Sequence, residues 1–218
     1  MKTSKILGIG IASLIGVSSC VTKIDEDHIN TENSFFMDIR TGQKVNIHNS
    51  ELMQYNSLAE RVIMESKKAG TYAIVVNKLN RRLDLYFKGD LARTFPVSLS
   101  RNPLEAKLYE LDYRVPEGIY NISKVRDVGE TIFYKAFMLN YPNERDRRNF
   151  LEARRDGLIP DHVNSPGGSI EIHGDGKDFD WTTGCVALRN EDMDELFPLI
   201  KVGTPVALVK TYEKPIRR

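Results

Sequence analysis

Residues 170–185 read IEIHGDGKDFDWTTGC and place a histidine and a cysteine at the two ends of one short segment. The segment begins as an alternating apolar strand, reaches His173, and ends at Cys185. The 218-residue chain has one other cysteine, Cys20. A cysteine within folding distance of a histidine predicts a thiol activated by an imidazole. A buried structural cysteine and an intermolecular disulfide are the alternatives.

The chemistry of a thiol nucleophile explains what this segment has to supply. A free thiol with a pKa of about 8.5 is only a few per cent thiolate at pH 7, so it needs His173 as a base. The carbonyl of Gly174 can approach the ring closely and orient it. Gly184 permits a turn that aims backbone N–H groups of the Thr183–Cys185 segment at a developing oxyanion. The alternative is a strand histidine satisfied by its core beside a cysteine packed as a small apolar group.

The N-terminus indicates export. Residues 1–20 read MKTSKILGIGIASLIGVSSC, a basic start followed by an apolar run of twelve residues. At about 1.5 Å per residue this run spans about 18 Å, too short to cross a bilayer but typical of a secretory signal. Val17-Ser18-Ser19-Cys20 resembles the bacterial lipobox, which predicts a signal peptide over residues 1–19 and lipid on Cys20. An ordinary signal peptide that contains a cysteine is the alternative.

The charge balance argues against nucleic acid as a partner. Removing residues 1–19 takes away two lysines and no acid, which leaves 29 basic and 30 acidic residues. Nucleic-acid binding would show a basic excess. If Cys20 carries lipid, Cys185 has no partner for an intramolecular disulfide, and a thiol retained in an oxidising compartment suggests use.

The rest of the chain predicts one mostly-β domain over residues 71–211, with a tail at 212–218. A polar segment at 20–50 is expected to be a tether, and spaced apolar residues ending at Gly70 predict a helix over 51–70. Two further helices are expected near 143–155 and 190–201. The remaining pattern consists of short β-like runs separated by turn residues: TYAIVVN, RLDLYFKG, TFPVSLS, GIYNISKV, FYKAFMLNY, SIEIHG and TPVALVK.

Residues 71–210 resemble the L,D-transpeptidase catalytic domain (the YkuD-like family), whose signature is His-Gly followed by Ser/Thr-x-Gly-Cys. The signature reads His173-Gly174 and Thr182-Thr183-Gly184-Cys185 here. VPEGIY, LNYPNERDR, SPGGSIEIHG and DWTTGCVALRNEDMDEL match other separated motifs, and the short spacing and GCVAL ending look most like the YafK-like branch. The resemblance implies a β-sandwich-like fold of mixed sheets with a few short helices.

The resemblance also implies candidate contacts and two departures. Tyr141, Asn143, Trp181 and Arg189 are candidate substrate-binding residues, although Trp181 could equally anchor its loop and Arg189 could be a solvated residue before a helix. Many family members have histidine where this chain has Thr183, and arginine or asparagine two positions after the cysteine, where this chain has alanine. Substrate contacts made by those side chains do not carry over.

The implied activity is cysteine acyl transfer on peptidoglycan stem peptides, without a metal or organic cofactor. Cys185 would attack the carbonyl of the third residue of a tetrapeptide stem, expel the terminal D-alanine, and pass the thioester to an amine of another stem or of an acceptor protein not identified by the sequence. A hydrolase with the same pair and water as acceptor is the alternative, as a carboxypeptidase or an amidase that releases stem-linked protein.

Three other expectations complete the sequence-based interpretation. A zinc hydrolase would have to draw on scattered donors whose spacing matches no metal motif: His162, His173, Asp175, Asp178, Asp180 and Cys185. A non-catalytic wall-binding lipoprotein is disfavoured by the intact Cys185 and His173. Because Val21 is not aspartate, resemblance to sorted lipoproteins predicts an outer-membrane anchor that faces the periplasm in a two-membrane cell.

Overall fold

The computed structural model describes residues 32–213. The expected signal peptide and the lipidation site Cys20 lie outside the described residues, as do residues 214–218. None of the helices in the described part is long and apolar enough to cross a membrane.

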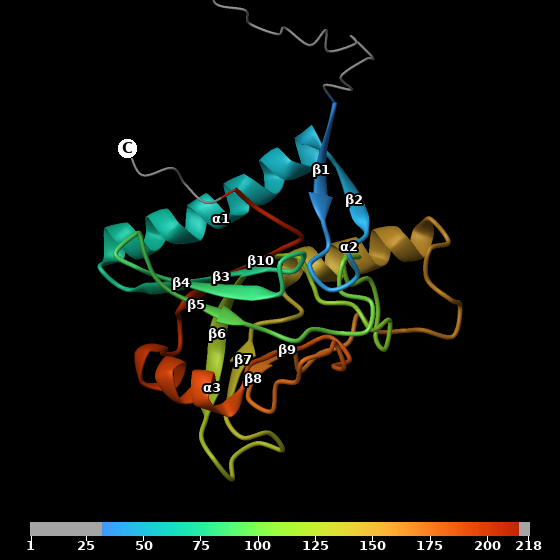
Figure 1. The fold of residues 1–218 in the computed structure, drawn as a ribbon. Coiled ribbons are helices and arrows are strands. Elements are labelled where there is room, and N and C mark those ends of the chain that lie inside the picture. Colours follow the sequence, from blue (N-terminus) through green and yellow to red (C-terminus); the bar gives the residue numbers. More distant parts are fainter. Residues whose placement is uncertain (1–31, 214–218) are drawn as a thin grey trace, which may run out of the picture. The chain divides into compact units, whose positions relative to one another are not determined.

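A mixed sheet of eight strands forms the body of the domain (Figure 1). The strand order is β5-β4-β3-β10-β6-β7-β8-β9, with parallel pairing at β3–β10 and β8–β9 and antiparallel pairing elsewhere. The strands are β3 (Tyr72–Asn77), β4 (Arg82–Phe87), β5 (Asp90–Pro96), β6 (Gly118–Arg126), β7 (Ala136–Leu139), β8 (Glu171–His173), β9 (Val186–Ala187) and β10 (Pro205–Val209).

The two ends of this sheet are drawn together by the chain that follows β5. Ser98 and Ala187 exchange backbone hydrogen bonds of 2.9 and 2.8 Å, and Ser100 forms a bridge with Thr182. The segment after β5 therefore reaches β9 at the opposite end of the strand order, which requires the sheet to curve. This curvature brings Leu99 against the segment that carries Cys185, because Leu99 accepts the N–H groups of Trp181 and Thr182.

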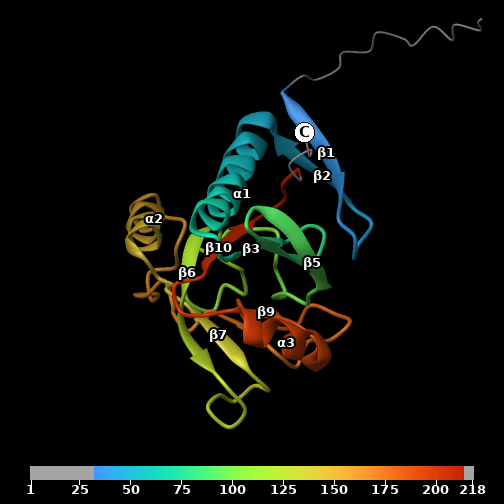
Figure 2. The same cartoon turned by 90° about the vertical axis from the view of Figure 1, so that its left-hand side faces the viewer.

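Both faces of the central strands are buried, which explains their nearly continuous apolar sequences. Ile74 and Val206 point into the core enclosed by the curved sheet. The alternate residues, Val75 and Ala207, pack in a second core with helix α1 (Asn49–Ala69). Figures 1 and 2 both show α1 on one side of β3 and β10 and α3 (Asn190–Leu196) on the other.

Helix α1 agrees with the sequence expectation to within two residues at each end. His48 caps its N-terminus by accepting the Ser50 N–H, and Gly70 ends it in the left-handed conformation at φ 69°. Lys67 and Lys68 lie in the last turn, where their positive charges interact favourably with the negative end of the helix dipole.

The expected tether is folded in its second half. Strands β1 (Asn33–Met37) and β2 (Lys44–His48) form an antiparallel hairpin with Asn33 opposite His48. Ile47 is fully buried in the second core against α1. The expectation of a tether through residue 50 is therefore wrong from residue 33 onward, because the hairpin contributes a core side chain.

The start of the expected tail is also part of the domain. Tyr212 is buried, and its hydroxyl donates to Asp84 Oδ2 at 2.6 Å and lies 2.9 Å from the hydroxyl of Tyr86. The remaining expectations agree more closely. Helix α2 (Glu144–Arg155) and helix α3, which continues into the 3-10 turn η1 (Phe197–Leu199), lie where two helices were expected. The mostly-β fold with mixed pairing is confirmed.

Candidate active site

The pairing of β8 with β9 places His173 and Cys185 on one face of the sheet. In this parallel pair Ile172 lies opposite Val186 and His173 lies opposite Ala187. Extending the register by one residue sets Cys185 opposite the first residue of β8, two positions before His173. Since side chains alternate along a strand, the imidazole and the thiol share a face while Ile172 and Val186 fill the core behind them.

The surroundings of His173 fix its tautomer. The side chain is fully buried, and Nδ1 lies 2.6 Å from the carbonyl oxygen of Gly174. A carbonyl only accepts hydrogen bonds, so Nδ1 carries the proton and Nε2 keeps a lone pair. Nε2 is buried and has no hydrogen-bond partner among the described residues. This nitrogen is therefore available to accept a proton.

Two aromatic side chains hold the imidazole ring. Phe133 stacks on His173 with ring centroids 3.6 Å apart and an interplanar angle of 10°. Trp181 meets the ring edge-on at 5.8 Å. Phe133 was not among the expected site residues, because it lies forty residues before His173 in a stretch without a recognisable motif. The edge-on contact places Trp181 beside His173, and its role in substrate binding stays a prediction.

Cys185 is almost completely buried, with 8% of its surface exposed. Its Sγ accepts the backbone N–H of Glu171 at 3.4 Å and donates to the carbonyl oxygen of Ser169 at 3.7 Å. The cysteine is free of any disulfide. The thiol is thus held at the start of β8 by two backbone contacts.

Burial keeps both groups neutral. It lowers the pKa of His173 to about 4, although the hydrogen bond to Gly174 and the charge of Asp175 act in the other direction. It raises the pKa of Cys185 to about 11, opposed in part by the Glu171 N–H. The resting state of the pair is therefore a neutral thiol and a neutral imidazole on the same face of the sheet.

The turn before Cys185 needs glycine. Gly184 has φ 153°, and a Cβ there would lie 3.0 Å from the carbonyl oxygen of Arg114 and 3.0 Å from Cδ1 of Ile170. Its N–H donates to Thr182 Oγ1 at 3.4 Å, and that hydroxyl donates to the Cys185 carbonyl at 2.8 Å. The Gly184 amide already has a partner in this structure, and Thr183 is exposed beside it. The oxyanion role of this segment stays a prediction.

Gly174 is confined just as closely. A Cβ at this position would lie 2.7 Å from Asn190 Oδ1 and 2.8 Å from the Cβ of Tyr134. Its N–H donates to the Lys135 carbonyl at 3.0 Å. The expected orienting role of the Gly174 carbonyl is matched by its contact with Nδ1 of His173.

Two of the expected substrate contacts also have structural roles. Tyr141 is buried in the main core, and its hydroxyl donates to the Pro166 carbonyl at 2.8 Å. Asn143 caps helix α2 and forms a capping box with Asp146. Burial and capping account for both side chains in the fold, and their contact with substrate stays a prediction.

Arg189 remains at the surface. It pairs with Asp178 at 2.6 Å, and both side chains are largely exposed. His162, a donor in the zinc alternative, is also exposed. Across residues 32–213 no three His, Cys, Asp or Glu side chains converge in a way that could hold a metal ion.

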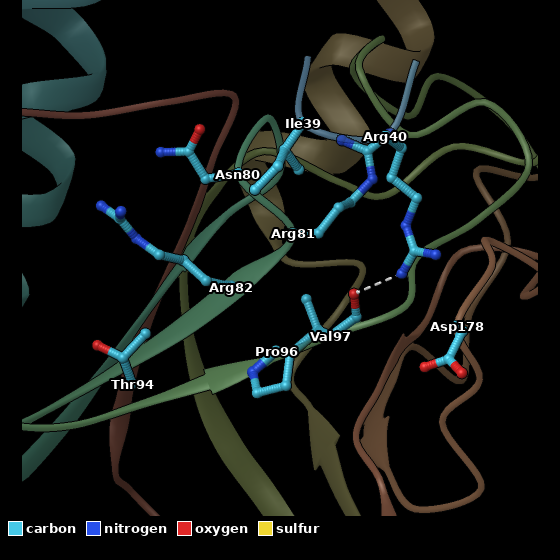
Figure 3. Close-up of a pocket in the computed structure, with 9 residues that line it drawn as sticks. All are labelled: Ile39, Arg40, Asn80, Arg81, Arg82, Thr94, Pro96, Val97 and Asp178. Atoms are coloured by element: carbon cyan, nitrogen blue, oxygen red, sulfur yellow. Dashed lines mark hydrogen bonds between the residues drawn. The ribbon is translucent and has the colours of Figure 1, made fainter. Parts of the chain in front are cut away.

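A pocket of about 630 Å³ lies beside the site but does not include Cys185 or His173. Figure 3 shows the guanidinium groups of Arg40, Arg81 and Arg82 pointing in different directions around it, with Arg40 donating to the Val97 carbonyl at 3.4 Å. Arg81 is buried and pairs with Asp38 and Asp180. Arg40 also contacts Asp180, at 3.7 Å, and Arg82 pairs with Asp84 at 2.8 Å, so all three cations of this pocket already have carboxylate partners.

The curved mixed sheet and the cysteine–histidine face of β8 and β9 define a class of protein. Residues 71–208, more than half of the chain, match the model of the L,D-transpeptidase catalytic domain (YkuD). The chain belongs to this enzyme family.

Individual relatives are more distant. YafK of Escherichia coli (strain K12), whose name places it provisionally among the L,D-transpeptidases, is 28% identical over 147 residues, which cover 64% of this chain and 52% of YafK. The chain thus spans about half the length of the curated relatives it matches.

The fold is similar to the crystal structure of the helical cell shape determining protein Pgp2 from Campylobacter jejuni. The TM-score is 0.50 at 21% identity, over 67% of this chain and 50% of Pgp2. The K307A mutant of Pgp2 gives a TM-score of 0.50 at 20% identity, over 78% of this chain and 59% of the mutant. At these identities the likeness concerns the fold alone.

Proposed function

We propose that this chain transfers acyl groups of peptidoglycan stem peptides through a thioester on Cys185, with His173 as the base. One observation carries the proposal. The Gly174 carbonyl fixes the proton on Nδ1, so the unpartnered Nε2 is the acceptor on the sheet face that also carries the thiol. Family membership supplies the substrate class.

The reaction divides into two acyl transfers. As Sγ attacks the carbonyl of the third stem residue, Nε2 takes the thiol proton, and the resulting imidazolium gives it to the departing amine of D-alanine. An acceptor amine then attacks the thioester and transfers a proton to Nε2. The imidazolium returns this proton to Sγ as the amide forms, which restores the neutral pair.

Product analysis tests the proposal. Residues 20–218 should be incubated with purified disaccharide tetrapeptides, and the products should be identified by mass spectrometry. We expect cross-linked dimers and free D-alanine from the wild type and neither from Cys185→Ser, whose hydroxyl has a pKa too high for this base. The Cys185→Ser, His173→Ala double variant should be no worse than either single variant, since the two groups act as a unit. Near wild-type turnover by Cys185→Ser would contradict the proposal.

The same measurement separates transfer from hydrolysis. Tripeptide and D-alanine without dimers would mean that water is the acceptor and that the chain is an L,D-carboxypeptidase with the same pair. Release of a protein from a stem-linked substrate would mean the amidase form of the alternative. The thiol and the imidazole have the same roles in all three reactions, so Cys185→Ser should abolish whichever of them the protein catalyses.

We propose further that the protein is exported and anchored by lipid on Cys20, in the outer membrane facing the periplasm. The support is the basic start, the apolar run and the Val17–Cys20 motif. Wild-type protein should take up a fatty-acid label and sediment with membranes, and Cys20→Ala should do neither. Unchanged labelling of Cys20→Ala would contradict the anchor.

A further inference from the structure

Arg114, in the segment that joins β5 to β6, is a half-buried cation without an acidic partner. Its Nε is buried and makes no hydrogen bond, and Nη1 reaches only the Ala106 carbonyl at 3.4 Å. Within residues 32–213 no ion pair joins this guanidinium to a carboxylate. A buried charged donor left unpaired costs stability unless something else binds it.

The acids buried around the site are already matched to other cations. Asp112 accepts the Lys107 ammonium at 2.8 Å and three backbone N–H groups, including that of Arg114. The other two pairs are Glu171 with Arg126 at 2.9 Å and Glu117 with Lys78 at 2.6 Å. The buried Nε of Arg114 therefore lacks the carboxylate partner that these other cations have.

The main chain of Arg114 lies against the turn that precedes the nucleophile. The carbonyl oxygen of Arg114 is 3.0 Å from the position of a Cβ on Gly184, and Nζ of Lys107 is 3.9 Å from the same point. Gly184 directly precedes Cys185. Lys107 uses two hydrogens, on Asp112 and the Tyr109 carbonyl, and an ammonium has three. The segment that carries the unpartnered Arg114 Nε and the buried Lys107 ammonium therefore packs against the turn before Cys185.

We propose that Arg114, assisted by Lys107, binds a carboxylate of the donor stem peptide. The inference rests on the proposed function. A donor tetrapeptide carries two candidates, the terminal carboxylate of D-alanine and the free carboxylate on the side chain of its third residue. A guanidinium binds a carboxylate through two parallel hydrogen bonds, and such a carboxylate would supply the partner that Nε of Arg114 lacks.

Binding without turnover tests the inference. The parent protein for this test carries Cys185→Ser, which prevents turnover and leaves the segment of Arg114 unchanged. It should be titrated by calorimetry with three synthetic tetrapeptides: the native form, a form amidated at the D-alanine, and a form amidated on the third residue. We expect Arg114→Gln to weaken native binding about 10- to 100-fold, the range for a hydrogen bond to a charged group. Amidating the recognised carboxylate should weaken the parent by the same factor and leave Arg114→Gln unchanged. The sensitive amide identifies which carboxylate is bound.

Two further variants serve as controls. Arg101→Gln removes an exposed arginine from the same segment and should bind all three peptides like the parent. Arg114→Lys keeps the positive charge but cannot form the two parallel hydrogen bonds, so its affinity for the native peptide should lie between those of the parent and Arg114→Gln. This variant also keeps the test usable if Arg114→Gln does not fold. The inference is overturned if native binding is equal in the parent and both Arg114 variants, or if amidation weakens parent and variant alike. If the parent binds none of the peptides, the proposed function itself fails.

Discussion

In the proposed mechanism the buried imidazole of His173 has to accept a proton, which sets the lower pH limit of activity. Burial lowers the pKa of His173 to about 4, so the ring stays neutral, and able to act as a base, well below its ordinary pKa of 6.5. We expect kcat/KM to be level from pH 7 down to about pH 5 and to fall with an inflection near pH 4. Stem-peptide turnover measured from pH 3.5 to 8 checks this prediction, and an inflection near 6.5 would contradict it.

Gly184 offers a second test at this scale. Replacing it with alanine puts a Cβ 3.0 Å from two neighbours at a φ of 153° that side chains rarely adopt. Gly184→Ala should lose about 1–3 kcal/mol of unfolding free energy and lower kcat at least about tenfold by displacing Cys185. Gly168→Ala is the matched control, because a Cβ there meets nothing within 4 Å. Urea unfolding and turnover assays give both quantities, and equal values for the two variants would refute the packing argument.

The sequence placed His173, Gly174 and Cys185 in one compact motif, and the structure brings these residues together on β8 and β9. Their catalytic roles stay predictions, and the sequence carries less information about their surroundings. Phe133 carries no such signal, because its contact with His173 depends on β7 pairing with β8. Asn143 stands in a motif of the family, and the structure adds that its side chain caps helix α2, a role that the sequence analysis did not assign to it.

At the scale of elements, Arg81 connects the N-terminal hairpin to the site loop. Its buried guanidinium pairs with Asp38 after β1 and with Asp180 beside Trp181. Arg81→Met should lower the unfolding free energy by about 3–5 kcal/mol, because it leaves Asp38 buried and uncompensated. Arg93→Met breaks an exposed pair with Glu195 and should cost less than about 1 kcal/mol.

Urea unfolding measures both variants. Trp181 is the only tryptophan of the chain, so its fluorescence should report a change in the site loop for Arg81→Met alone. A loss of stability in Arg81→Met no larger than in Arg93→Met would show that the pairs with Asp38 and Asp180 do not stabilise the fold.

The sequence predicted the elements that have a strong apolar periodicity, but not those that are defined by pairing with distant segments. Helix α1 follows from its apolar face and Gly70. Strand β9 has two residues and exists because His173 and Ser98 pair with it, which no local pattern indicates. The hairpin of β1 and β2 was read as a tether because only one of its ten residues, Ile47, is buried.

For the whole molecule, α1 should be required even though the family match begins after it. Removing residues 1–70 would uncover the apolar outer face of the central strands, which α1 covers through Ala59, Val62 and Ile63. We expect residues 71–218 to bind an apolar dye, to aggregate in size-exclusion chromatography, and to lack a cooperative urea transition. A fragment from residue 32 onward should behave as a monomer, and an equally cooperative 71–218 fragment would contradict the prediction.

The neutral state of Cys185 has a consequence for inhibitor selectivity. Simple alkylating agents react with a preformed thiolate. The nearly buried Cys185, with a pKa of about 11, supplies very little thiolate for them to attack. A strained cyclic amide with its own carboxylate is different, because its carbonyl is attacked while Nε2 of His173 takes the proton. Compounds of the second kind should therefore discriminate this protein from cysteine enzymes that keep a standing thiolate, and their potency should follow fit to the site more than intrinsic reactivity.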